Sequence, residues 1–225
     1  MKNTYLGAYT EGRMIMGRSR RILLFVFLTI LGMASCLWIA NQVYAGHCRR
    51  TMDRALHSVQ YLRLHESTMM EAISQLQFVN NGKYEQRVDA DGDREIDIHV
   101  IAPQGGFRKL GRIILFSITL TFDSSDRLNS RRVTFMSNSA LCCSVEVWEL
   151  SSSAGPQYSG FKVLRYTPYS VIVHSNSDAS AIAREGIWNW QLSCLTSFGG
   201  CNDARQILPI LRLAGGPGDG WPRPQ

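Results

Sequence analysis

The sequence predicts an α+β fold, with an N-terminal transmembrane helix, two short helices and an antiparallel β-sheet domain. Three observations support this prediction. Residues 22–45 contain no charge, residues 52–78 repeat apolar side chains at helical spacing, and from residue 83 apolar residues recur at every second position. Helical stripes followed by alternating segments are typical of helices packed on one sheet. The 225 residues, 45% hydrophobic and 19% charged, are enough for one domain with a core.

The uncharged stretch is long enough to cross a membrane. Its more strictly apolar part, Ile22–Ala40, would cover about 28 Å as a helix, close to the hydrocarbon thickness of a bilayer. Trp38 and Tyr44 lie near its far end, where aromatic rings prefer the headgroup layer. We therefore expect an uncleaved single-pass anchor over residues 22–45.

Two other fates stay open for this stretch. Small side chains at Val43 and Ala45 offer a cleavage site before Gly46, although the apolar run exceeds the roughly 7–15 residues of a signal peptide. Cys36, in the sequence MASC, would be the lipidated residue of a lipoprotein signal. The four residues after Cys36 are apolar, where a lipoprotein has a polar tether.

Basic residues gather before the anchor. Residues 1–21 contain five basic side chains and one acidic, whereas residues 46–225 contain 19 basic and 17 acidic. Lysine and arginine favour the cytoplasmic side, so we expect a cytoplasmic tail over residues 1–21 in a cell inner membrane and a periplasmic domain over residues 46–212. An excess confined to the tail gives no domain-wide phosphate-binding surface, so nucleic acid is not an expected partner.

Periodicity locates the elements of the exported domain. Met52, Leu56, Val59 and Leu62 form one apolar stripe that continues the anchor as a helix. Thr68 and Glu71 form a capping box, which predicts a second helix over about residues 69–78. A last short helix is expected over 203–208, and the Gly/Pro-rich residues 213–225 are expected to be disordered. Predicted strands are 83–88, 96–101, 112–122, 132–136, 144–150, 161–165, 170–174 and 187–194.

The cysteines indicate an oxidising compartment. Cys194 and Cys201 enclose the short loop CLTSFGGC, in which two glycines permit a turn, and we predict a disulfide there. Two reduced, buried cysteines are the alternative. The vicinal Cys142 and Cys143 are unsuited to pairing with each other, but one of them could reach Cys48. No Cys/His spacing suited to zinc occurs.

The acidic stretch VDADGDREIDIHV at residues 88–100 has two interpretations. Asp89, Asp91, Asp93 and Asp97 occupy positions 1, 3, 5 and 9 of a calcium loop, but position 6, where glycine permits the turn, is Arg94. The alternative is a β-hairpin whose turn is Asp91-Gly92, followed by Ile96, Ile98 and Val100 on one face of a strand. We favour the hairpin and keep calcium as the one cofactor alternative.

Motifs for catalysis are missing from the sequence. There is no GxSxG, HExxH, GxxxxGK[ST] or dinucleotide glycine fingerprint, and the five histidines are scattered. The segment GIWNWQLSCL places Trp188 and Trp190 on one face of its predicted strand. If their rings are exposed, Trp188 and Trp190 could form a platform for a ligand. If the rings are buried, they belong to the hydrophobic core.

The order of these features resembles a known type of protein. A basic flank, a membrane helix, LRLHEST before a capped helix, mid-chain cysteines and a terminal CLTSFGGCNDARQILP are similar to uncharacterised single-pass membrane-anchored proteins of acidobacterial type. That resemblance implies a membrane-anchored domain. It implies no specific activity, because none is established for proteins of this type.

Together these features predict a non-enzymatic binding or scaffolding domain of the cell envelope. The expected partners are the lipid bilayer and an envelope protein or glycan. A membrane-tethered hydrolase, or a calcium-binding module that uses residues 89–97, is the alternative.

Overall fold

The computed structural model describes residues 7–88, 92–103, 113–137, 143–151, 161–167, 169–197 and 200–213. The chain divides into two compact units, Met1–Asn41 and Gln42–Gln225. One helix, α1 (Gly7–Tyr61), contributes residues to both units. Asp89, Asp91, Cys142 and the predicted tail from residue 214 onward lie outside the described residues.

The first unit contains the apolar part of α1. Within the described residues this is the one helix long and apolar enough to cross a membrane. Its large side chains are exposed, for example Phe25 at 70% and Leu37 at 73%. The predicted N-terminal helix of transmembrane type is therefore present, and the protein itself does not cover its apolar surface.

The second unit is built on a seven-stranded sheet, which confirms the α+β prediction. The strand order is β1-β2-β3-β4-β5-β7-β6, and every neighbouring pair is antiparallel except β5 and β7. The strands are β1 (Glu85–Val88), β2 (Arg94–Pro103), β3 (Ile113–Phe122), β4 (Leu128–Ser137), β5 (Ser144–Leu150), β6 (Phe161–Thr167) and β7 (Ser170–Asn176).

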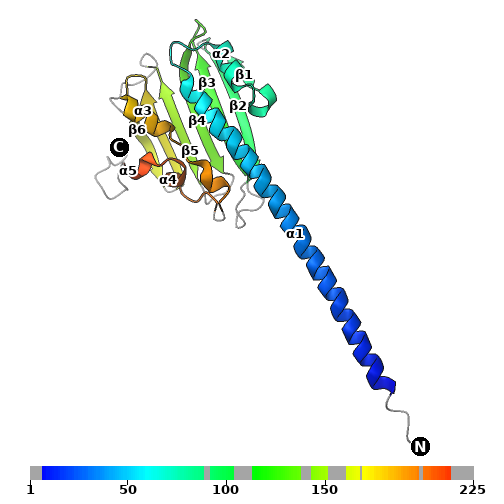
Figure 1. Cartoon of the computed structure of the whole chain (residues 1–225). Coiled ribbons are helices and arrows are strands. Elements are labelled where there is room, and N and C mark those ends of the chain that lie inside the picture. Colours follow the sequence, from blue (N-terminus) through cyan, green and yellow to red (C-terminus); the bar gives the residue numbers. More distant parts are fainter. Residues whose placement is uncertain are drawn as a thin grey trace, which may run out of the picture. The chain divides into compact units, whose positions relative to one another are not determined.

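The described helices of this unit lie on one face of the sheet (Figure 1). They are the C-terminal part of α1, then α2 (Met69–Leu76), α3 (Ala181–Trp188), α4 (Ala204–Ile207) and α5 (Ile210–Leu213). The described residues also form two 3-10 turns, η1 (Val79–Gly82) and η3 (Leu192–Leu195).

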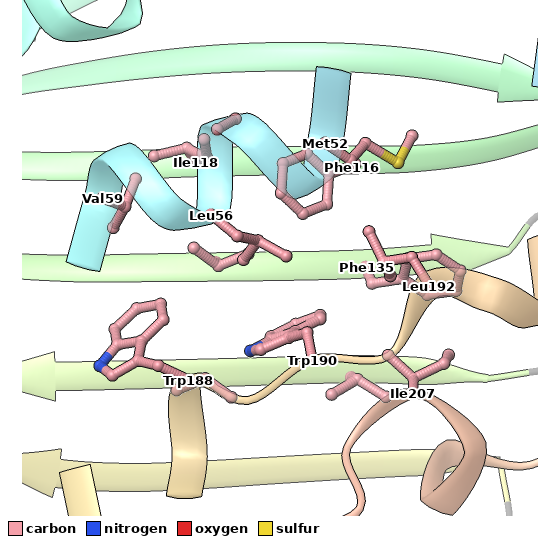
Figure 2. Close-up of a cluster of buried hydrophobic side chains, with 14 of the residues drawn as sticks. Met52, Leu56, Val59, Phe116, Ile118, Phe135, Trp188, Trp190, Leu192 and Ile207 are labelled. Atoms are coloured by element: carbon pink, nitrogen blue, oxygen red, sulfur yellow. The ribbon is translucent and has the colours of Figure 1, made fainter. Parts of the chain in front are cut away.

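The core lies between the helices and the sheet. The predicted α1 stripe is confirmed, because Met52, Leu56, Val59 and Leu62 are all at most 4% exposed. Figure 2 shows Met52, Leu56 and Val59 of the stripe packed over Phe116, Ile118 and Phe135 of the two central strands. Each such side chain contributes roughly 1.5–3 kcal/mol when removed from water, so the stripe alone fixes α1 firmly on the sheet.

The hairpin interpretation of the acidic stretch is confirmed at the strand level. β1 and β2 pair antiparallel, with Val88 opposite Arg94 and Glu85 opposite Asp97. Gly92 has φ +84, the left-handed conformation that glycine adopts without strain. Arg94 donates to Asp126 at 2.7 Å, so its charge pairs with the next hairpin.

The predicted strand over residues 187–194 is wrong. These residues form the end of α3, a short irregular segment and η3. Ser180 caps α3 by accepting a hydrogen bond from the Ala183 N–H at 3.3 Å. Ile187 and Trp188 are both buried, which a helix permits for neighbouring residues and a strand would place on opposite faces.

The other short helices agree with the sequence within a few residues. Thr68 accepts from the Glu71 N–H at 3.3 Å and starts α2, which ends at Leu76 rather than at residue 78. Asp203 accepts from the Arg205 N–H at 2.8 Å and starts α4, within the helix expected over 203–208.

A buried ion pair ties the helix layer to the sheet. Arg131 of β4 lies directly opposite Glu149 of β5, and both point into the core with side chains 7% and 0% exposed. The guanidinium donates to Glu149 Oε2 from Nη2 at 2.6 Å and from Nε at 2.8 Å. It also donates to the carbonyls of Val59 and Leu62, the latter at 2.8 Å.

Trp188 completes this cluster. Its indole Nε1–H donates to Glu149 Oε2 at 2.8 Å, and the Arg131 guanidinium carbon lies 4.8 Å from the centre of its ring. Burial lowers the pKa of Arg131 from its usual range, and the Glu149 carboxylate partly opposes that change. The last turn of α1, two strands and α3 therefore meet at one pair of charges.

We expect Glu149→Gln to lower the free energy of unfolding by about 3–5 kcal/mol, because Arg131 would stay charged and buried without a carboxylate. Denaturant unfolding of the full-length protein in detergent, followed by tryptophan fluorescence, measures this loss.

The matched control is Glu66→Gln, which removes the same charge from an ion pair whose side chains are 76% and 66% exposed. We expect that substitution to change the free energy of unfolding by less than about 1 kcal/mol. Equal losses in the two variants would contradict the central role of Glu149.

Candidate functional site

The main candidate site is a groove between α1 and α3, which we call the α1–α3 groove. It is open to solvent and has a volume of about 400 Å³. Its lining residues come from one face of α1, from the end of α3 and from the segment after α3. They are Asp53, Leu56, His57, Gln60, Glu185, Trp188, Asn189 and Trp190.

Helical spacing places these side chains on facing surfaces. Asp53, His57 and Gln60 follow one another at intervals of four and three residues, so they lie on one side of α1 beside the buried stripe. Glu185 and Asn189 are four apart around the C-terminal end of α3. Gln60 Nε2 donates to the carbonyl of Trp188 at 2.8 Å, which joins the two walls directly.

The lining is acidic. Among the residues that the structure describes, the lining contains two carboxylates, Asp53 and Glu185, and no lysine or arginine. Burial raises the pKa of Asp53 above its usual range, and the attraction of Arg49, whose Nε lies 3.6 Å from Asp53 Oδ2, opposes this only in part. A cationic group entering the groove would meet negative charge near an apolar floor, where attraction is stronger than in open water.

The two tryptophans lie under the groove and form no exposed platform. Trp188 and Trp190 are 3% and 8% exposed, and the Trp190 Nε1–H donates to the Ile187 carbonyl at 3.1 Å. The Trp190 ring packs edge-on against Phe116, with centroids 6.5 Å apart. The two tryptophans therefore belong to the hydrophobic core, which was the alternative to a ligand platform. Only the edges of their rings can reach a ligand in the groove.

Two of the four predicted calcium-loop residues, Asp93 and Asp97, are described, and they lie in different surroundings. Asp97 lies inside β2, 7% exposed, and accepts a hydrogen bond from Thr119 Oγ1 at 2.5 Å. Asp93 lies between Gly92 and Arg94, the first residue of β2. Asp89 and Asp91 lie outside the described residues, so calcium binding stays a prediction. Within the described parts of the chain, no three His, Cys, Asp or Glu side chains group as metal ligands.

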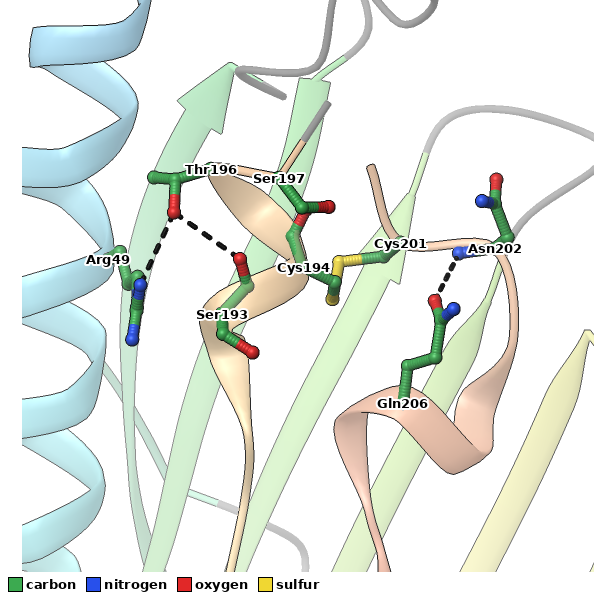
Figure 3. The surroundings of a disulfide bond; sticks show 8 residues. All are labelled: Arg49, Ser193, Cys194, Thr196, Ser197, Cys201, Asn202 and Gln206. Atoms are coloured by element: carbon green, nitrogen blue, oxygen red, sulfur yellow. Dashed lines mark hydrogen bonds between the residues drawn. A yellow bond between two sulfur atoms is a disulfide. The ribbon is translucent and has the colours of Figure 1, made fainter. Parts of the chain in front are cut away.

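The predicted disulfide between Cys194 and Cys201 is present. Figure 3 shows its surroundings, where Arg49 of α1 donates to Thr196 Oγ1 at 3.2 Å and the Asn202 N–H donates to Gln206 Oε1 at 2.9 Å. Arg49 thus contacts both the disulfide loop and Asp53 of the groove. Cys48 and Cys143 are both buried in the core. Cys48 is a free cysteine, so the disulfide considered between Cys48 and one of the vicinal cysteines is not formed in this structure.

Sequence reasoning did not identify Asp53, Gln60 or Glu185. The one available signal was local, since Asp53, His57 and Gln60 border the apolar stripe at helical spacing. Glu185 and Asn189 are far from them in the sequence, and no spacing rule connects residues of separate helices.

Comparison with known proteins identified no relative, because no family model, curated protein or solved structure matches the chain.

We expect reduction of the Cys194–Cys201 bond to lower the free energy of unfolding by about 2.5 kcal/mol, the chain-entropy value for a loop of about eight residues. Unfolding curves recorded with and without reductant measure the difference. The Cys194→Ser/Cys201→Ser double variant is the control, and it should show no effect of reductant. A wild-type curve unchanged by complete reduction would contradict this prediction.

Asp53 should produce a pH dependence of stability. The pKa of the Asp53 carboxyl group is near 3.8 in the unfolded chain and is higher in the folded protein. The folded protein therefore binds the proton of Asp53 more tightly than the unfolded chain does. As pH rises from below 3.8 through the folded-state pKa, wild type loses stability at this residue and Asp53→Asn does not.

The free energy of unfolding of Asp53→Asn minus that of wild type should therefore increase over this window and then level off. Denaturant unfolding at steps between about pH 3 and pH 7 measures it. A difference that falls with rising pH would show that Arg49, rather than burial, dominates at Asp53.

Proposed function

We propose that this chain is a single-pass membrane protein of the cell envelope, whose domain from Gln42 onward binds a partner through the α1–α3 groove without catalysing a reaction. The anchor part of the proposal is supported by α1, because the large apolar side chains between Ile22 and Ile39 are 37–73% exposed. Side chains of this kind are stable in lipid rather than in water. The basic residues before them favour a cytoplasmic N-terminus.

The disulfide supports export of the domain. Cys194 and Cys201 are joined, and such bonds persist in oxidising compartments such as the periplasm. A cell inner membrane with the domain on its periplasmic side satisfies both the charge asymmetry and the disulfide.

The observation that carries the binding proposal is the acidic lining of the α1–α3 groove. Two carboxylates, two amides and one imidazole line an open groove of about 400 Å³ over an apolar floor. This arrangement suits a ligand with one cationic amine and neighbouring hydrogen-bonding groups. Such chemistry occurs in a lysine side chain of an envelope protein and in a glucosamine unit of a glycan.

The proposal can be tested with two pairs of probes that differ only in the charge of the amine. One pair is the capped tripeptide Ala-Lys-Ala and its acetyl-lysine form, and the other is a glucosamine trimer and its N-acetylated form. We expect the charged member of at least one pair to shift the NMR signals of the Trp188 indole and the His57 ring. Whichever pair responds distinguishes a peptide from a glycan partner.

Glu185→Gln should weaken that binding about fivefold, the effect of losing one partly exposed charge pair. Glu146→Gln is the matched control, because Glu146 lies on β5 and points to the sheet face away from the helices. Equal binding of charged and acetylated probes, or equal weakening by the two substitutions, would contradict the proposal.

One observation favours a hydrolase as the second candidate. Asp53 has a raised pKa and shares the groove with the carboxylate of Glu185, and glycoside hydrolysis uses a protonated and an ionised carboxyl group. Cleavage of either glucosamine oligomer that Asp53→Asn abolishes, with binding retained, would favour this candidate over simple binding.

A further inference from the structure

An exposed aromatic ring borders the α1–α3 groove. Tyr61, the last residue of α1, is 65% exposed, so most of its surface is open to solvent. Its ring meets the ring of His57 edge-on, with centroids 4.8 Å apart and planes at 69°. His57 lines the groove, so the Tyr61 ring lies at the margin of the groove. Helical spacing agrees with this placement, because Asp53, His57 and Tyr61 follow at intervals of four residues along one side of α1.

The groove and the Tyr61 ring together are longer than a single amine requires. Asp53 and Tyr61 are eight positions apart, about 12 Å along the helix axis. The carboxylates of Asp53 and Glu185 line the groove, whereas Tyr61 lies beyond His57. A ligand that fills both places therefore carries its amine in the groove and an apolar surface on a neighbouring unit.

The end of α3 offers no main-chain acceptor to a peptide. The Trp188 carbonyl already accepts from Gln60 Nε2 at 2.8 Å and from the Trp190 N–H at 3.0 Å. The Ile187 carbonyl accepts from Trp190 Nε1 at 3.1 Å. The opposite wall is α1, whose backbone groups bond within the helix. A peptide bound here would give up hydrogen bonds between its main chain and water without replacement, which is unfavourable.

Side chains therefore supply the polar contacts, and they suit a sugar. Asn189 is exposed at the groove, and its amide can both donate and accept hydrogen bonds. Sugar hydroxyl groups also donate and accept, and the C–H face of a sugar ring is apolar and packs on an aromatic face. Carboxylates for an amine, an amide for hydroxyl groups and an exposed ring for a sugar face together fit an amino sugar within a chain.

We propose that Tyr61 is a second binding position of the α1–α3 groove, which stacks on one sugar ring while the groove holds the amine of an adjacent glucosamine unit. The partner is then a glycan that contains glucosamine rather than a lysine side chain. This inference rests on the proposed function, because the amine position is the acidic lining described above. It adds one binding residue and a minimum ligand length, and both can fail while amine binding persists.

Affinity for ligands of different length tests the inference. Glucosamine carries the amine alone, whereas the glucosamine trimer also reaches Tyr61. Each probe is titrated by NMR against the full-length protein in a detergent without a sugar headgroup, with the Trp188 indole and His57 ring signals as the readout. Tyr61→Ala removes the ring, and Tyr61→Phe retains the ring without its hydroxyl. Cooperative unfolding with the wild-type midpoint shows that each variant is folded.

Tyr169→Ala is the matched control. Tyr169 is 52% exposed and directly precedes β7. Its carbonyl accepts from the Ser144 N–H at 2.7 Å at the start of β5, whereas Trp188 of the groove bonds to Glu149 near the end of that strand. Five residues of strand, about 17 Å, separate Ser144 from Glu149. This variant removes an exposed tyrosine ring without changing the groove.

We expect Tyr61→Ala to weaken binding of the trimer about 3- to 10-fold, the equivalent of one aromatic contact, and to leave binding of glucosamine unchanged. Tyr61→Phe and Tyr169→Ala should bind both probes as the wild type does, because each keeps the ring at position 61.

Trimer binding unchanged by Tyr61→Ala, or weakened equally by Tyr169→Ala, would overturn the second position and leave the groove intact. Equal weakening of both probes by Tyr61→Ala would give the residue a structural role and would also overturn it. Trimer binding lost in Tyr61→Phe would assign the effect to the hydroxyl group, against stacking. Binding of the lysine tripeptide with no response to either glucosamine probe would make the partner a peptide and overturn this inference alone. No response to any charged probe would overturn the proposed function and this inference together.

Discussion

The ion pair between Arg131 and Glu149 is the interaction on which the other contacts of the domain depend. A charge buried alone is strongly destabilising, so each member is stable in the core only beside the other. Arg131 also donates to the carbonyl of Val59 in the last turn of α1 and to that of Leu62 just after the helix. Glu149 accepts the indole N–H of Trp188. The pair therefore fixes the end of α1 and the end of α3 relative to the two strands beneath them, and any displacement of one helix would leave a buried polar group unsatisfied.

The α1–α3 groove follows from that constraint. Its walls are the two helices that the ion pair positions, and Gln60 joins them across the gap. A site on helices held by buried hydrogen bonds keeps its geometry better than a site on loops. The same α1 surface that buries Leu56 and Val59 presents Asp53 and His57 beside them, so packing and binding use adjacent stripes of one helix. Arg49 adds a link from Asp53 to the disulfide loop.

The candidate site was less predictable than the fold because its residues come from separate elements. Helical spacing indicates that Asp53 and His57 share a side of α1, but nothing in the sequence relates them to Glu185. The pattern Trp-Asn-Trp at 188–190 predicted a strand with one aromatic face. In the structure Trp188 ends a helix, because Ser180 caps its start and Glu149 provides a buried acceptor for its indole. That acceptor comes from β5, which no local pattern near Trp188 reveals.

The sequence by itself determined the features that depend on neighbours within one element or one short loop. These are the apolar span before Ala45, the stripe from Met52 to Leu62, the capped start of α2, the hairpin around Gly92 and the disulfide across CLTSFGGC. Each is decided by local geometry, such as a helical repeat, a positive φ or a short closed loop. Tertiary structure alone decided the rest: the buried ion pair, the helical form of residues 181–188 and the acidic groove. Their energies depend on which distant segment removes water from a charge or leaves an apolar side chain exposed, and that is known only once the helices and the sheet have packed.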